Sequence, residues 1–231
     1  MTSLDDSTGG MISGTPRPQP DDAPHSDDWS TISEELLQGL VHALNNRVAA
    51  LSAFVELAKL GDDEGDPVKA LPAEIAQLHR VNTLFGMLPE RKAEPEALEL
   101  SVVLDDALRL HEHHPRLRGV PVAAAFEGMA AVVRAPRWAL VRALVMLVDS
   151  ARRSAESVQS RGAVTLRVRG DDRTVSVRAP AAVEPSPDLV ALAARCSGSM
   201  MREDGELVLS MPSVRELRRR ERESRGDSSP S

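Results

Sequence analysis

The 231-residue sequence is poor in aromatic residues and contains no tyrosine. Phe and Trp together make up only 2% of the chain, so its cores have to be filled by Leu, Val and Ala, as is common in helical bundles. This scarcity also leaves no aromatic platform on which nucleic-acid bases could stack. The formal net charge is −7, and only the segment 215–225 is locally rich in arginine. We therefore expect no nucleic-acid partner.

Cysteine is represented by one residue, Cys196. A single thiol can neither close an intrachain disulfide nor complete a structural zinc site, so no metal centre is expected. No apolar run approaches the roughly 20 residues that a membrane-spanning helix needs. The N-terminus carries Asp5 and Asp6 instead of the basic and apolar regions of a signal peptide. We expect a cytoplasmic protein without a membrane partner.

The distribution of apolar residues divides the sequence into four parts. Residues 1–30 are rich in Ser, Asp, Gly and Pro and lack apolar periodicity, which predicts a disordered tail. Residues 31–90 have a helical pattern, and residues 95–213 mix helical and extended patterns. Residues 214–231 are charged almost throughout, which predicts a frayed helix that passes into disorder.

A long helix is predicted to begin at Thr31, because Thr31-Ile32-Ser33-Glu34 has the form of a capping box. Apolar residues follow at alternating steps of four and three, the spacing of a coiled-coil seam. The first seam consists of Leu37, Val41, Leu44, Val48, Leu51, Val55 and Ala58. After a polar turn over 61–67, the second consists of Val68, Leu71, Ile75, Leu78, Asn82 and Phe85.

Two such helices predict an antiparallel hairpin. One hairpin alone leaves much of its apolar seam exposed, so we expect two copies to pair into a four-helix bundle, as a homodimer. The following part has helical patterns over 102–110, 136–158 and 189–195 and extended patterns over 120–126, 163–168, 174–178 and 206–211. This alternation predicts a two-layer α/β sandwich, and the fold class is α+β.

The first helix carries the clearest candidate for chemistry, His42. The heptad assignment places Val41 and Leu44 inside the bundle and His42 on its flank, reachable from solvent. Asn46 follows one turn later on the same face, so its amide can orient a group near the imidazole. Further along this flank, Ala49, Ala50, Ser52 and Ala53 leave little bulk, as close docking of another protein needs. The alternative is that alanine is simply a good helix former.

The segment Leu40-Val41-His42-Ala43-Leu44-Asn45-Asn46 resembles the H-box of histidine kinases, whose usual form is His-Glu-Leu-Asn-Asn-Pro. The hairpin and the α+β domain that follows agree with it, so the resemblance covers residues 31–213. It implies that His42 is a phosphoacceptor, that Asn46 positions a hydrolytic water and that the hairpin dimerises. It also implies response-regulator receiver domains as partners. A histidine without a role on a helix flank is the alternative.

Two residues depart from the H-box pattern. Ala43 replaces the carboxylate that accepts the imidazole proton, and Arg47 replaces the proline that commonly bends the helix. Autophosphorylation with ATP should suffer most, since general-base help is worth roughly two to four orders of magnitude. Exchange with a receiver can proceed without the base, because the receiver's own carboxylates and Mg²⁺ supply the electrostatics.

The second domain departs from the family pattern as well. The helix 138–151 resembles the kinase N-box helix, but Asp149-Ser150 replaces its Asn-Ala pair. We interpret Asp149 as a capping or solvent-facing residue. After Val177, where the family presents a glycine-rich Asp-x-Gly-x-Gly motif, the chain reads Arg178-Ala179-Pro180-Ala181-Ala182-Val183. Binding of ATP and Mg²⁺ is therefore not expected, and the domain resembles a degenerate histidine-kinase ATPase domain.

The other candidates give weaker signals. His111, His113 and His114 are crowded, but we interpret them as a solvated helix terminus because no further ligands accompany them. Cys196 is interpreted as a small core residue. His79 lies beside the second seam and receives no role.

The leading hypothesis is a histidine phosphotransferase that passes a phosphoryl group between receiver aspartates through His42, without a working autokinase. A non-catalytic dimeric adaptor that binds response regulators is a second hypothesis. A divergent but active ATP-dependent histidine kinase is a third.

Overall fold

The computed structural model describes residues 28–60, 67–90, 93–129, 131–157 and 163–226. Most of the tail predicted for residues 1–30 lies outside these ranges. So do residues 61–66 of the predicted turn and the last five residues of the charged C-terminal segment.

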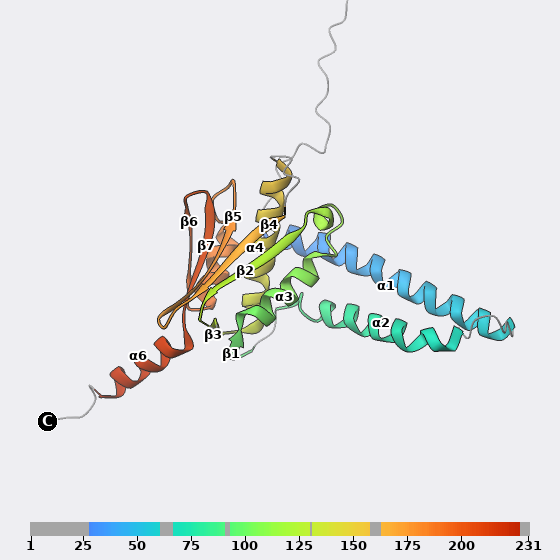
Figure 1. Cartoon of the computed structure of the whole chain (residues 1–231), viewed down its shortest axis with the longest axis horizontal. Helices are drawn as coiled ribbons and strands as arrows, with labels where there is room; N and C mark the ends of the chain where they lie inside the picture. Colours follow the sequence, from blue (N-terminus) through green and yellow to red (C-terminus); the bar gives the residue numbers. More distant parts are fainter. Residues whose placement is uncertain (1–27, 61–66, 91–92, 130, 158–162, 227–231) are drawn as a thin grey trace, which may run out of the picture.

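The described part of the chain begins with a helical hairpin (Figure 1). It consists of α1 (Trp29–Leu60), the short 3₁₀ helix η2 (Pro67–Ala70) and α2 (Leu71–Phe85). The backbone N–H of Thr31 donates to Oδ1 of Asp28 at 2.8 Å, so Asp28 caps the helix and α1 starts at Trp29. The prediction that Thr31 is the cap was wrong, because the carboxylate three residues earlier takes that role.

The helices and strands expected after residue 95 are confirmed, with bounds shifted by a few residues. They are α3 (Leu100–His111), β2 (Val122–Gly128), α4 (Arg137–Ser157), β4 (Val164–Gly170), β5 (Thr174–Pro180), α5 (Pro187–Arg195) and β7 (Glu206–Pro212). The structure adds elements that the pattern analysis missed: β1 (Glu96–Glu99), η3 (Leu117–Gly119), β3 (Val132–Ala135) and β6 (Ser199–Glu203). The three added strands have only four or five residues, too few to show a clear alternation.

A five-stranded mixed sheet forms one layer of this part, in the order β2-β4-β5-β7-β6. β2 pairs parallel with β4, and the other neighbours are antiparallel. Helices α3, α4 and α5 form the second layer, while β1 and β3 pair separately (Figure 1). Alternate residues of β4 are buried, as expected for a sheet covered by helices on one face. The two-layer α+β sandwich is confirmed.

The hydrophobic core runs from the sandwich into the first turns of α1. Ile32, Leu36 and Leu40 are at most 1% exposed and belong to the same cluster as Leu140 and Leu144 of α4. Burying each such side chain stabilises the folded state by about 1.5–3 kcal/mol. The N-terminal third of α1 is therefore attached to the sandwich, and the remainder extends away from it beside α2 (Figure 1).

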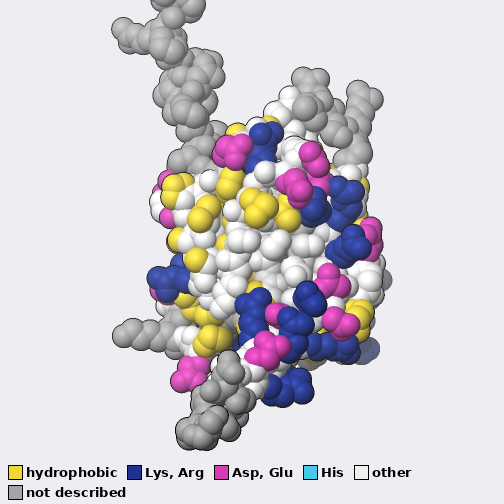
Figure 2. Space-filling view, turned by 90° about the vertical axis from the view of Figure 1, so that its left-hand side faces the viewer, with side chains coloured by type: hydrophobic (Ala, Val, Ile, Leu, Met, Phe, Trp, Pro, Cys, Tyr) yellow, Lys and Arg dark blue, Asp and Glu magenta, His cyan; other side chains and the backbone are white. Residues whose placement is uncertain are grey.

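The opposite end of the molecule carries charged side chains of both signs. Figure 2 views the side that faces away from the hairpin, where basic and acidic side chains are intermixed. Arg167 pairs with Glu206 at 2.6 Å, and Arg178 with Glu203 at 2.8 Å. This pairing indicates a solvated face.

The charged C-terminal segment forms helix α6 (Val214–Gly226), which projects from the sandwich (Figure 1). Its start is fixed by Ser213, whose Oγ accepts from the N–H of Glu216 at 3.1 Å. Through residue 226 the segment is therefore helical. Among the described helices, none combines the length and apolar character needed to cross a bilayer.

Candidate functional site

His42 lies on the exposed part of α1, beyond the turns that pack on the sandwich. The side-chain nitrogen Nδ2 of Asn46 is 3.2 Å from Nε2 of the His42 ring. Because an amide nitrogen only donates, Nε2 accepts this hydrogen bond and the ring proton resides on Nδ1. The predicted neighbours are thus in contact, and the imidazole is held in the tautomer whose nucleophilic nitrogen is Nε2.

The flank of α1 that follows His42 and Asn46 carries small side chains. Ala49 and Ala53 are exposed and Ala50 is half-buried. The hydroxyl of Ser52 donates back to the carbonyl oxygen of Val48 at 2.9 Å, so it does not reach outward. A partner can approach the backbone of α1 closely here.

Arg47 replaces the proline of the H-box pattern and connects the two helices of the hairpin. Its NH1 lies 3.1 Å from Oε2 of Glu74 in α2, and both side chains retain contact with solvent, at 40% and 20% exposure. The ion pair sets the position of α1 relative to α2 along the helix axes beside His42.

Replacing Arg47 by Ala should change stability only slightly. Ion pairs that remain hydrated contribute about 0.2–1 kcal/mol, because water screens their attraction. We expect the free energy of unfolding of Arg47→Ala, measured by urea denaturation, to fall by about 1 kcal/mol or less. Glu74→Ala should give the same loss, and the double variant no further loss. A clearly larger effect would show that the pair carries more of the hairpin than its exposure suggests.

Asp149 is buried, at 1% exposure, so the interpretation of this residue as a capping or solvent-facing group was wrong. Its Oδ1 accepts from Nε2 of His111 at 3.0 Å, and its Oδ2 from Nε of Arg153 at 2.5 Å. Burial opposes the charged form, but the hydrogen bonds from His111 and Arg153 and the charge of Arg153 outweigh it and lower the pKa of this carboxyl. Both carboxylate oxygens are already engaged by protein donors.

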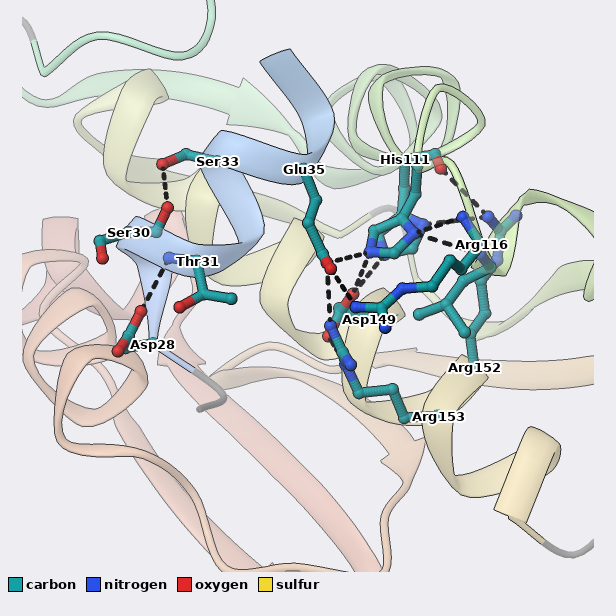
Figure 3. Close-up of polar contacts among 12 residues, drawn as sticks. Asp28, Ser30, Thr31, Ser33, Glu35, His111, Arg116, Asp149, Arg152 and Arg153 are labelled. Carbon is teal, nitrogen blue, oxygen red and sulfur yellow. Dashed lines mark hydrogen bonds and ion pairs between the residues drawn. The ribbon is translucent and has the colours of Figure 1, made fainter. Parts of the chain in front are cut away.

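His111 and His114 are fully buried, so the prediction of a solvated helix terminus was wrong for both. Their rings stack with centroids 5.1 Å apart and planes inclined by 7°. Nε2 of His114 lies 2.6 Å from Oε2 of Glu35 on α1. Arg153 also reaches Glu35, at 3.2 Å, and Arg116 pairs with the same carboxylate (Figure 3). These groups join α1, the segment after α3, and α4 in one polar network.

The side of α4 that faces α5 is closely packed. Helix α5 packs on α4, and its residues Leu189 and Leu192 are buried. A cavity of about 10 Å³ remains. It is lined by Met146, Ser150, Glu184, Ser186, Leu189 and Leu207. Such a space holds about one water molecule, whereas ligand pockets typically measure about 300–1,000 Å³. A nucleotide does not fit among these residues.

A larger cleft, of about 770 Å³, lies between the end of α2 and the start of α4, with Phe85, Arg137 and Trp138 among its lining residues. The other residues considered in the sequence analysis do not come together. Burial raises the pKa of the Cys196 thiol to about 12, as fits an unreactive core residue. Within the described ranges, no three His, Cys, Asp or Glu side chains gather in a way that suits a metal ion.

The polar network around Asp149 escaped the sequence analysis, although one signal pointed to it. Asp149 interrupts a helix whose residues 143–148 are all apolar, so it had to be buried and therefore paired. Arg153, four residues later, is the partner on the same helix. Glu35 gave no such signal, because nothing in its local sequence distinguishes it from a solvated residue.

No protein-family model matches the sequence, and the comparison with curated proteins gives no match. Among solved structures, one similar chain is the ATP-binding domain of PrrB from Mycobacterium tuberculosis, at 13% identity and a TM-score of 0.39, covering 52% of this chain and 98% of that one. Another is the Acinetobacter baumannii histidine kinase AdeS, at 12% identity and a TM-score of 0.40, covering 77% and 95% respectively. A third is histidine kinase ThkA in complex with the response regulator TrrA, at 16% identity and a TM-score of 0.37, covering 81% and 64%.

Proposed function

We propose that this chain is a dimeric phosphotransfer protein of two-component signalling. In this proposal His42 exchanges a phosphoryl group with aspartates of response-regulator receiver domains, and ATP does not serve as the donor. The observation that carries the proposal is the exposed His42 ring, whose Nε2 is held by the Asn46 amide at 3.2 Å above a flank of small residues.

The chemical step needs little from this chain. The Asn46 amide first releases Nε2 of His42, and the freed lone pair attacks the phosphorus of an aspartyl phosphate. A P–N bond forms, and the P–O bond to the aspartate breaks. The carboxylate leaves, and the proton on Nδ1 stays on the ring, so no base is required. The receiver's own acidic residues and Mg²⁺ stabilise the charge during transfer. The Asn46 amide is placed to hold the ring before transfer and a phosphoryl oxygen after it.

Two further observations support a donor other than ATP. Ala43 offers no carboxylate that could take the Nδ1 proton and raise the nucleophilicity of Nε2 toward a γ-phosphate, a gain worth roughly two to four orders of magnitude. The cavity beside Ser150 holds about one water, and the oxygens of Asp149 are engaged by His111 and Arg153.

The proposed dimer is supported by an apolar stripe on the hairpin. Leu37, Val41, Val48 and Val55 are between 42% and 50% exposed in the single chain. They belong to the seam that steps by four and three residues, and Ile75 of α2, at 46% exposure, extends it. Pairing two hairpins would bury this stripe in a four-helix bundle.

The proposal is tested by following a labelled phosphoryl group. A receiver domain labelled through a small phosphodonor is mixed with this protein and a second, unlabelled receiver. We expect label on this protein and then on the second receiver, and none on either acceptor with His42→Ala. His79→Ala, which alters an exposed histidine on α2, should behave like wild type. Binding of receivers without labelling would indicate the adaptor.

A parallel reaction with [γ-³²P]ATP and Mg²⁺ separates the proposal from an autokinase. We expect no label on His42 from ATP. Millimolar MgATP should also leave the melting temperature unchanged, because a ligand stabilises a protein only in proportion to its binding. Label from ATP on wild type but not on His42→Ala would instead identify an active kinase.

A further inference from the structure

The polar network between α1 and the sandwich contains a histidine whose hydrogen bonds define its protonation state. Nδ1 of His114 accepts from the backbone N–H of Leu117 at 3.1 Å and that of Arg116 at 3.3 Å. Nε2 therefore carries the ring proton, and this N–H donates a hydrogen bond to Oε2 of Glu35 at 2.6 Å. The neutral ring satisfies both sides of this arrangement. Protonation at Nδ1 would set an N–H against two backbone N–H groups.

The groups around His114 come from every element that packs against it. They are Glu35 of α1; His111 at the end of α3; Glu112, His113 and Arg116 of the following segment; and Asp149, Arg152 and Arg153 of α4. Arg152 NH1 lies 3.0 Å from Nδ1 of His111, so that ring too accepts on Nδ1 and donates from Nε2 to Asp149. Three guanidinium groups surround the pair of rings, and an additional positive charge is unfavourable there.

The polar network lies at the contact between α1 and the sandwich. Glu35 is the α1 residue that these groups bind, and it lies between the buried residues Ile32 and Leu36. One turn later, a Cβ at Gly39 would overlap the backbone carbonyl oxygen of His113, so α1 and this segment touch directly. Loss of the Glu35–His114 hydrogen bond would thus act on the helix that carries His42.

We propose that His114, with Glu35 and Asp149, forms a proton-sensitive latch that holds α1 on the sandwich while the His114 ring is neutral and loosens when it is protonated. The proposal concerns the attachment of α1 and does not depend on phosphoryl transfer. It assigns His114 and Glu35 as positioning residues for the helix that carries His42.

The direction of the pH dependence follows from the pKa of His114 in the two states. Burial lowers the pKa of docked His114 below 6.5, and the charges of Asp149 and Glu35 offset this only in part. Releasing α1 opens the His114 ring to solvent and removes part of the burial that is the largest cause of this lowering, so the pKa rises toward 6.5 and the ring takes up a proton more readily as the pH falls. Docking is therefore complete above pH 6.5 and weakens below it. The pKa of Glu35 lies below 4.5, because His114 and Arg116 outweigh its burial, so Glu35 keeps its charge in this range.

Amide hydrogen exchange, measured by NMR on the full chain, tests the latch. Protection of the Leu117, Leu36 and Leu40 amides, corrected for intrinsic exchange, should fall up to about ten-fold between about pH 7.5 and pH 5.5. The amides of β5 and β7 should keep their protection. Equal loss in these strands would show global unfolding, and unchanged protection of Leu117, Leu36 and Leu40 would show no latch; either result would overturn the proposal.

Two variants separate protonation from packing. His114→Gln retains a donor toward Glu35 but does not titrate, so protection of Leu36 and Leu40 should become independent of pH. Gly39→Ala displaces α1 by its methyl group, so protection should be lower at every pH while the ratio between the two pH values stays that of wild type. An acid-induced loss in His114→Gln equal to that of wild type would contradict the latch. If that variant does not fold, the wild-type comparison decides alone.

Discussion

Replacing Asp149 by Ala should destabilise the protein by about 3–5 kcal/mol, because removing one partner of a buried ion pair takes away the carboxylate that both His111 and Arg153 donate to. The carboxylate is 1% exposed and accepts from both Arg153 and His111. Without it, the Arg153 guanidinium loses the acceptor of its 2.5 Å hydrogen bond, and His111 Nε2–H faces a cavity. Urea denaturation followed by far-UV circular dichroism measures the loss.

Asp172→Ala is the matched control for this prediction. Asp172 also pairs with an arginine, Arg215, at 2.6 Å, but both side chains are about 70% exposed. Its removal should cost about 1 kcal/mol or less, since hydrated pairs contribute little. Equal losses in the free energy of unfolding for the two substitutions would show that burial of the Asp149 network adds nothing to stability.

Val48→Asp should convert the proposed dimer into a monomer. Val48 is 50% exposed in the single chain and lies on the apolar stripe, so the protomer should fold normally. In a two-fold symmetric bundle the substitution buries two carboxylates, each at a cost of several kcal/mol. Because about 1.4 kcal/mol corresponds to a ten-fold change, the dissociation constant should rise at least about 100-fold. Sedimentation velocity at several protein concentrations measures it.

Ala53→Asp adds the same charge to the same helix and serves as the control. Ala53 is exposed and lies outside the seam, on the flank proposed for the receiver, so this variant should remain dimeric. It should lose receiver binding instead. A monomeric wild type, or a dimeric Val48→Asp, would contradict the proposed bundle.

Sequence patterns predicted most elements of this fold because apolar periodicity encodes packing directly. The seam of α1, the long helix α4 and the alternating strands β4 and β5 could all be recognised from it. The same reasoning did not anticipate that α1 would use a second face. Ile32, Leu36 and Leu40 lie beside the seam and are buried against the sandwich, a tertiary contact that no local pattern specifies.

Polar residues were harder to interpret from the sequence. His42 and Asn46 are four residues apart on one helix, so their contact followed from helix geometry. His114 and Glu35 are 79 residues apart, and His111 and Asp149 are 38 apart. Pairs this distant in sequence leave no periodic signal, and the histidines were consequently assigned to the surface.

The network also changes how Asp149 is understood. The sequence suggested a capping or solvent-facing residue at this position, whereas the structure places a buried carboxylate that accepts hydrogen bonds from two basic side chains. The residue that departs from the kinase pattern therefore has a structural role of its own, and together with Glu35 it connects the hairpin to the sandwich.

The most direct test of the central claim is to locate the phosphoryl group on the protein itself. The full chain is incubated with a phosphorylated receiver domain and then examined by ³¹P NMR and by mass spectrometry of peptides kept at alkaline pH. We predict an acid-labile phosphoryl group on Nε2 of His42, absent from His42→Ala and not formed with MgATP alone. A receiver that binds the protein and loses its phosphoryl group to water, while His42 stays unmodified, would contradict the account.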